Sequence, residues 1–160
     1  MAEYNRRLRH VVAALSEEQL AMQPSPERWP LWATVGHTAC QRVFWLCDFA
    51  REPGVDTTRF TNATYNCPGD DDLENVLSAK ELVAALDSTF RIVENCLDRW
   101  TLAMLDEEIR REDFGPDWVH LRGLGPAAGL QPRRLALRRA QRVAERRTAA
   151  GDRLLGLRRH

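Results

Sequence analysis

The chain of 160 residues has 23 Lys and Arg residues and 23 Asp and Glu residues, so its formal net charge is zero. Its hydrophobic content of 44%, with five Trp, two Tyr and five Phe residues, excludes a wholly disordered chain. A chain of this length can bury a core as a single domain. No apolar run reaches the length of about 18 residues that a membrane span needs. The charged start, MAEYNRRLRH, predicts a protein without a secretory signal.

The charge is divided between two parts of the chain. Residues 1–123 have a net charge of −8, whereas residues 124–160 have a net charge of +8, because ten Arg residues face only two acidic residues there. Every aromatic residue lies at or before Trp118. We therefore distinguish an acidic, aromatic-rich unit over 1–123 from an Arg-rich C-terminal segment over 124–160.

The spacing of apolar residues is helical throughout the first unit and predicts an all-α fold without strands. A first amphipathic helix is expected over Ala2–Leu15. Its predicted apolar face consists of Tyr4, Leu8, Val11, Val12 and Leu15. Ser16 and Gln19 form an S-x-x-Q capping box, which predicts a short helix ending near Met22. The proline-rich residues 24–30 are expected to form a loop.

A second long helix is predicted over Leu31–Arg51, with an apolar arc wide enough to pack against two neighbours, as in a bundle. Residues 53–77 then form a long connection, which indicates a crossover loop or a lid over a site. Its acidic run at 70–72 lacks the spacing and the glycine of a calcium loop, so a solvated loop is the favoured interpretation over a cation site.

Ser78 and Glu81 form a second capping box, which begins a third long helix ending near Trp100. Its predicted inner stripe consists of Leu82, Leu86, Phe90, Val93, Leu97 and Trp100. After an acid-rich segment, residues 117–123 are expected to start a fourth helix. Three long helices and the start of another predict a four-helix bundle.

The four cysteines, Cys40, Cys47, Cys67 and Cys96, form no C-x-x-C pair and no spacing typical of zinc sites. Cys40 and Cys47 lie seven residues apart on one predicted helix, about 10.5 Å along its axis, which is too far for a disulfide. We therefore expect structural thiols in the core and a cytoplasmic protein.

His37 is the main candidate for chemistry, because it lies at the edge of the apolar arc of the second long helix. Neutral imidazole binds zinc, nickel and iron well. A catalytic metal needs about three protein ligands, and His10, His120 and His160 form no H-x-x-x-H pair. A lone histidine at such a position is also typical of a hydrogen-bonded core residue, so both interpretations stay open.

The stretch that begins at Trp29, WPLWATVGHTACQRVFWLCDFAREPG, resembles the second helix of the DinB-like family. These bacterial four-helix bundles are named for DNA-damage-inducible members. The resemblance continues through FTNATYNCPGDDDLENVLSAKELVAALDSTFRIVENCLDRWTLAMLDEEI and DWVHLRG, so it covers residues 1–123. It implies an up-and-down four-helix bundle related to thiol-dependent transferases and to maleylpyruvate isomerase.

The resemblance also implies a metal site. The family binds a divalent metal (Zn, Ni or Fe) through three histidines, of which the one on the second helix corresponds to His37. The other two lie one turn apart on the fourth helix, in a pattern like S-H-D-x-x-H-x-x-E-L. The implied activity is that of a divalent-metal-dependent thiol S-transferase or isomerase. Its partners would be a small-molecule substrate and a low-molecular-weight thiol; a homodimer stays open.

After Gly123 the chain departs from the family, because LGPAAGLQPRRLALRRAQRVAERR contains neither of these histidines. Permitted codons for this segment, read one base later, give W-V-L-Q-R-V-F-S-H-D-V-W-H-C-A, with the histidine pair at the family's spacing. The same frame continues with E-L-N-E-S-L-S-G-A-R-L-P-A-I-D-Y-W-D and a stop. We therefore predict that residues 124–160 are a frameshifted translation of the fourth helix, and that the enzyme is crippled.

The alternative is a helical protein that is purely structural or that binds nucleic acid through its basic segment. Seven Arg residues lie between 133 and 147, within a stretch, 133–155, whose composition favours a helix. Such a segment could contact phosphates. Because it lacks interleaved aromatic residues, binding would be non-specific and sensitive to salt. Electrostatic docking of this segment on the acidic unit is equally open.

Overall fold

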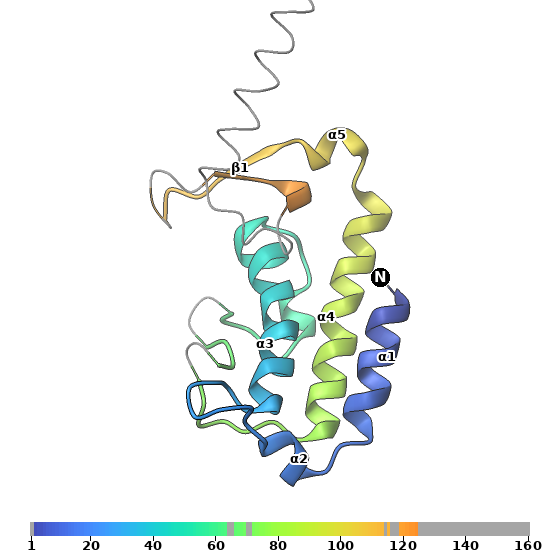
Figure 1. The fold of residues 1–160 in the computed structure, drawn as a ribbon. Coiled ribbons are helices and arrows are strands. Elements are labelled where there is room, and N and C mark those ends of the chain that lie inside the picture. The colour runs from blue at the N-terminus through green and yellow to red at the C-terminus, as the bar shows by residue number, and fades with distance from the viewer. Residues whose placement is uncertain (1, 64–65, 70–71, 114, 116–118, 125–160) are drawn as a thin grey trace, which may run out of the picture.

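The computed structural model describes residues 2–63, 66–69, 72–113, 115 and 119–124. Three long helices lie side by side, and α4 packs against both of the others (Figure 1). They are α1 (Ala2–Ala13), α3 (Leu31–Val43) and α4 (Ala79–Arg99). The short helix α2 (Glu17–Ala21) follows α1 at the end of the bundle where α3 begins. The predicted all-α class is confirmed.

Both predicted capping boxes begin the helices that they were expected to begin. Ser16 Oγ accepts a hydrogen bond from the Gln19 backbone N–H (3.2 Å), and Gln19 Oε1 accepts one from the Ser16 N–H (2.9 Å). Ser78 and Glu81 make the same two bonds at the start of α4, over 3.3 and 2.9 Å. Each box satisfies backbone donors that the first turn of a helix leaves unpaired.

The second predicted helix is longer than α3, because a π-helical segment continues it over Phe44–Phe49. Arg51 then adopts the left-handed region at φ 61°, which ends the helix two residues beyond this segment. The Arg111 guanidinium donates hydrogen bonds to the backbone carbonyls of Asp48 and Phe49. A side chain from 62 and 63 residues further along the chain therefore satisfies carbonyl groups that the helix end exposes.

Helices α3 and α4 run in the same direction (Figure 1). Arg42, near the end of α3, donates to the Leu86 carbonyl over 3.0 Å, and Glu52, beyond that end, pairs with Arg99 over 2.7 Å. Later residues of one helix thus contact later residues of the other. The order differs from the expected up-and-down arrangement, because the connection between the two helices crosses back along the bundle.

The apolar core lies between the three long helices and includes residues from the connection. Its members from the connection are Phe60, Ala63, Cys67 and Leu77. On α4, Leu82 and Leu86 are fully buried as predicted, but Leu97 is 51% exposed. The predicted apolar face of α1 is partly wrong, because Tyr4 is 82% exposed.

Asn5 on α1 is buried in place of the apolar residues expected there. Its side-chain oxygen accepts a hydrogen bond of 2.9 Å from Arg42 Nη1, which also donates to the Thr89 hydroxyl on α4 over 3.3 Å. Burial lowers the pKa of the Arg42 guanidinium. One half-buried arginine thus joins all three helices, and polar partners offset the cost of partly burying its charge.

The expected start of a fourth helix is wrong over 119–121. These residues form strand β2 (Val119–Leu121), which pairs antiparallel with β1 (Glu108–Arg110). The register places Ile109 opposite His120. A short helix, α5 (Leu102–Leu105), connects α4 to this ribbon. In V-H-L, half-buried and buried positions alternate, which is the period of a strand. A segment this short cannot show whether its apolar residues follow the helical or the strand period.

The predicted helix over 133–155 lies outside the described residues. Within the part of the chain that the structure describes, no helix is long and apolar enough to cross a membrane.

Candidate functional site around His37

His37 lies on the face of α3 that meets the residues around Pro68. Its ring is half-buried, and Nδ1 lies 3.0 Å from the Pro68 carbonyl oxygen. Because a carbonyl can only accept, Nδ1 carries the proton and donates. The Trp29 ring packs against the imidazole with centroids 4.8 Å apart. Hydrogen bonding and aromatic packing together hold the imidazole in one orientation.

A cysteine pair lies beside this imidazole. Cys40, on α3, forms a disulfide with Cys67, from the connection, across a Cα–Cα distance of 5.8 Å. His37 Nδ1 lies 3.6 Å from Cys67 Sγ, and the side-chain amide of Gln41 donates to the same sulfur over 3.9 Å. The expectation of four free core thiols is therefore wrong for this pair. Cys47 and Cys96 are free and buried, as predicted.

The spacing of the cysteines does not predict this pairing. The two cysteines are separated by 27 residues, and the folded connection alone brings Cys67 to α3. The only local indication is that His37, Cys40 and Gln41 are spaced three and four residues apart, which places them on one helical face.

The residues after Cys67 close the site on one side. Gly69 has φ +95°, and a Cβ added there would lie 2.8 Å from ring atoms of Trp29. Its N–H donates to the Asp72 carbonyl over 3.0 Å. The Asp72 carboxylate accepts from the backbone and side chain of Asn75, and these bonds lower the pKa of that carboxyl. Asp72 is therefore engaged in its own turn, whereas Asp70 and Asp71 lie outside the described residues.

The described residues do not fit a family-type metal centre. No three His, Cys, Asp or Glu side chains among them are grouped so that they could hold a metal ion. His10 is exposed on α1. His120 is buried on β2, where its ring contacts those of Trp45 and Phe49 with centroids 5.2 Å away, and burial lowers its pKa. His37 therefore gains no histidine partner in this part of the chain, and His160 lies outside it.

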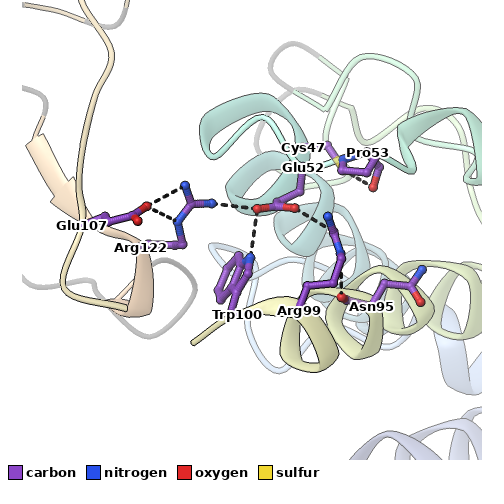
Figure 2. A network of polar contacts seen from close by, with 8 residues as sticks. All are labelled: Cys47, Glu52, Pro53, Asn95, Arg99, Trp100, Glu107 and Arg122. Atoms are coloured by element: carbon purple, nitrogen blue, oxygen red, sulfur yellow. Dashed lines mark hydrogen bonds and ion pairs between the residues drawn. The ribbon is translucent and has the colours of Figure 1, made fainter. Parts of the chain in front are cut away.

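A second polar cluster lies at the other end of α3 (Figure 2). The Glu52 carboxylate, whose side chain is only 8% exposed, accepts hydrogen bonds from Arg99 (2.7 Å), the Trp100 indole (2.9 Å) and Arg122 (2.7 Å). Arg122 also pairs with Glu107, over 3.1 Å. The cluster joins three parts of the chain: the end of α4, Glu52 three residues beyond the π-helical segment, and Arg122 directly after β2. We refer to Glu52, Arg99, Trp100 and Arg122 as the Glu52 cluster. Its charged groups are all paired, which is typical of a structural element.

Comparison with models of known protein families identifies the family of the chain. The model of the DinB superfamily matches residues 3–125, which is most of the chain. The chain belongs to the DinB superfamily. Searches of curated proteins and of solved structures returned no match.

Membership of the DinB superfamily bears out the family resemblance. The match ends two residues beyond Gly123, close to the point where the sequence composition changes. His37 occupies the second long helix, where the resemblance expects a ligand. In this DinB-superfamily chain, the neighbours of His37 include Pro68, Cys67 and Trp29.

Proposed function

We propose that this chain derives from a divalent-metal-dependent thiol S-transferase or isomerase of the DinB superfamily and that it is crippled as an enzyme. On this proposal the protein is cytoplasmic. The ancestral enzyme used a small molecule and a low-molecular-weight thiol as substrates. His37 is the ligand that it keeps. The two ligands of the fourth helix are missing from its sequence.

The observation that supports this proposal is the contact set of His37. Its Nδ1–H donates to the Pro68 carbonyl, which leaves Nε2 as the ring nitrogen that could bind a metal, but no group of three metal-binding side chains is found among the described residues. A catalytic zinc site typically uses three protein ligands and keeps one position for water or substrate. One histidine alone leaves the metal mostly to solvent, so we expect weak, non-stoichiometric binding.

Metal content of the purified full chain tests this proposal. The protein is loaded with Zn²⁺, Ni²⁺ or Fe²⁺, dialysed, and analysed by mass spectrometry for metal per chain. We expect no stoichiometric metal. Stoichiometric metal that is lost in His37→Ala would overturn the proposal.

A restored chain provides the matched comparison. It joins residues 1–123 to the sequence read one base later, which carries the histidine pair. We expect this protein to bind one metal ion per chain and to lose it in the His37→Ala background. If the restored chain bound no metal, the ancestry would be wrong even though the 160-residue chain is metal-free.

We also propose that residues 1–123 and 124–160 are separate units and that the second is translated from a shifted reading frame. The end of the family match at residue 125 supports this division. The nucleotide sequence across the Gly123 codon tests it. Codons that cannot encode the fourth-helix sequence in the second frame would refute the frameshift.

A second candidate function is carried by the charge of +8 on residues 124–160. We propose non-specific nucleic-acid binding, because clustered arginines neutralise phosphates and release counterions. An electrophoretic shift assay at two salt concentrations compares the full chain with a variant in which the seven arginines from 133 to 147 become glutamine. Binding that neither salt nor this variant weakens would contradict it.

A further inference from the structure

The Cys40–Cys67 pair joins α3 to the connection before α4, two segments between which the described residues show no regular backbone pairing. Cys40 is on α3 and Cys67 is in the connection before α4. The Cα–Cα distance of 5.8 Å is within the range that a disulfide spans without backbone movement. Both residues are buried, at 0% and 2% exposure. The folded structure therefore holds the two sulfur atoms together.

Two polar side chains of α3 are directed at one of the two sulfurs. His37 Nδ1 lies 3.6 Å from Cys67 Sγ, and the Gln41 amide nitrogen lies 3.9 Å from it. The Nδ1–H that donates to the Pro68 carbonyl therefore also faces Cys67. Hydrogen-bond donors stabilise the negative charge that a cysteine sulfur carries when it leaves a disulfide.

The other two cysteines have a different environment. Burial, followed by the charge of Asp48, raises the pKa of the Cys47 thiol to about 11. Burial, followed by the charge of Glu52, raises the pKa of the Cys96 thiol to about 11. Apolar surroundings and nearby carboxylates make thiols unreactive. Cys47 and Cys96 are therefore internal controls for the reactivity of the pair.

We propose that Cys40 and Cys67 form a reversible thiol–disulfide site that exchanges with small-molecule thiols, and that His37 stabilises the Cys67 sulfur in the reduced form. The inference is independent of the metal-site proposal. It agrees with the proposed cytoplasmic location, where disulfides are usually redox-sensing or catalytic rather than permanent.

The exchange proceeds in two steps. A thiolate attacks Cys40 Sγ, the Cys40–Cys67 bond breaks, and its electron pair goes to Cys67 Sγ, which accepts hydrogen bonds from His37 and Gln41. A second thiolate attacks the small-molecule sulfur of the mixed disulfide and releases Cys40 Sγ, and Cys40 Sγ and Cys67 Sγ each take a proton from water. Two small thiols are thereby oxidised to one disulfide, and the protein gains two thiols. Since both sulfurs are buried, exchange is slower than at an exposed disulfide.

Equilibration in glutathione buffers tests the site. The full chain, treated with a chelator to remove any metal, is incubated at a series of ratios of reduced to oxidised glutathione. Free thiols are then alkylated in denaturant, and each cysteine is read by peptide mass spectrometry. We expect Cys40 and Cys67 to become alkylated together, as a two-electron pair. Cys47 and Cys96, which are free in the structure, should be alkylated at every ratio.

Variants of His37 test its role. In His37→Phe an aromatic ring remains against Trp29 but the donor is lost. Losing one hydrogen bond to a charged sulfur should shift the thiol–disulfide equilibrium about tenfold toward the disulfide. For this two-electron couple, a tenfold shift corresponds to about 30 mV in the reduction potential. His37→Asn keeps a donor at the position of Nδ1, so its equilibrium should lie close to that of the wild type.

Three results would overturn the inference. They are independent alkylation of Cys40 and Cys67, a pair that stays fully oxidised or fully reduced at every ratio, and an equilibrium that is equal in the wild type, His37→Phe and His37→Asn. Circular dichroism shows whether each variant folds. If His37→Phe does not fold, Gln41→Leu replaces it, with a smaller shift in the same direction. Because no metal is present, the result does not depend on whether the metal proposal holds.

Discussion

Glu52 connects three segments that are far apart in the sequence, and it does so with a carboxylate that is nearly inaccessible to water. Two arginines and an indole donate to its two oxygens (Figure 2). Replacement by glutamine leaves one acceptor oxygen and directs an N–H₂ group at an arginine. Removing one member of a buried ion pair leaves the other charge uncompensated. We expect Glu52→Gln to lower the free energy of unfolding by about 2–3 kcal/mol, measured by urea denaturation.

Glu107 offers a matched control for this prediction. It binds the same Arg122, but its side chain is 50% exposed. Exposed ion pairs contribute little because water screens them, so Glu107→Gln should cost less than about 1 kcal/mol. Equal losses in the two variants would show that burial of Glu52 is not the reason for its effect.

Gly69 is the residue whose backbone conformation the candidate site requires. Its φ of +95° is unfavourable for any side chain, and a Cβ there would lie 2.8 Å from the Trp29 ring. We expect Gly69→Ala to destabilise the protein by about 1–3 kcal/mol, because strain and displacement of Trp29 act together. The change in tryptophan fluorescence on folding should decrease in parallel. Unchanged stability and fluorescence would contradict this account of the turn.

Single residues also show what a sequence can reveal about the site. His37 was found because a histidine at the edge of an apolar arc is unusual. Its true neighbours, Cys67 and Pro68, were not found, because a connection of irregular backbone has no periodicity that could place them. Asn5 was missed for a related reason, since its burial depends on Arg42 from another helix. Contacts between elements are not encoded in the spacing within either one.

The capping box of α4 makes the stability of this helix depend on pH. The backbone N–H of Ser78, followed by its hydroxyl and by Arg59, lowers the pKa of the Glu81 carboxyl from 4.5 to about 2. A carboxyl with a depressed pKa stabilises the folded state above its unfolded value, and this stabilisation is lost as the pH falls toward the folded value. Because Glu81 is exposed, the effect is small. In Glu81→Gln this dependence between pH 4.5 and about 2 should disappear, as measured by urea midpoints.

The first capping box supplies the converse variant. Gln19 occupies in α2 the position that Glu81 has in α4. Gln19→Glu should therefore introduce a loss of stability in the same acid range. If neither substitution changed the pH profile, the hydrogen bonds of the boxes would not be controlling it.

At the level of elements, the sequence predicted best what is determined locally. Ser-x-x-Gln and Ser-x-x-Glu each define a helix start within four residues, and both starts are correct. The π-helical segment and the ribbon were not predicted. The first depends on Arg111 at carbonyls of the helix end, and the second on pairing between β1 and β2. In both, the stabilising partner lies outside the segment itself, so the spacing within the segment does not reveal it.

The molecule as a whole exposes apolar side chains on its described elements. Tyr4 and Leu102 are more than four-fifths exposed, and Val11 and Leu97 are about half exposed. We expect the full chain to bind a hydrophobic dye and to unfold over a broad temperature range, because on the proposed frameshift residues 124–160 no longer supply the fourth helix of the bundle. The restored chain should bind less dye and unfold at a higher temperature. Sharp thermal unfolding of the 160-residue chain without dye binding would contradict this.

The Glu52 cluster also determines where a protease can cleave the folded protein. A trypsin-like protease must take an arginine side chain into its specificity pocket. Arg122 is the last arginine before the composition changes, its side chain is 16% exposed, and two carboxylates hold it. It is therefore a poor cleavage site in the folded state. Proteolysis from the C-terminal side should stop beyond the ribbon, so the family-matched body has a protected boundary whatever sequence follows it.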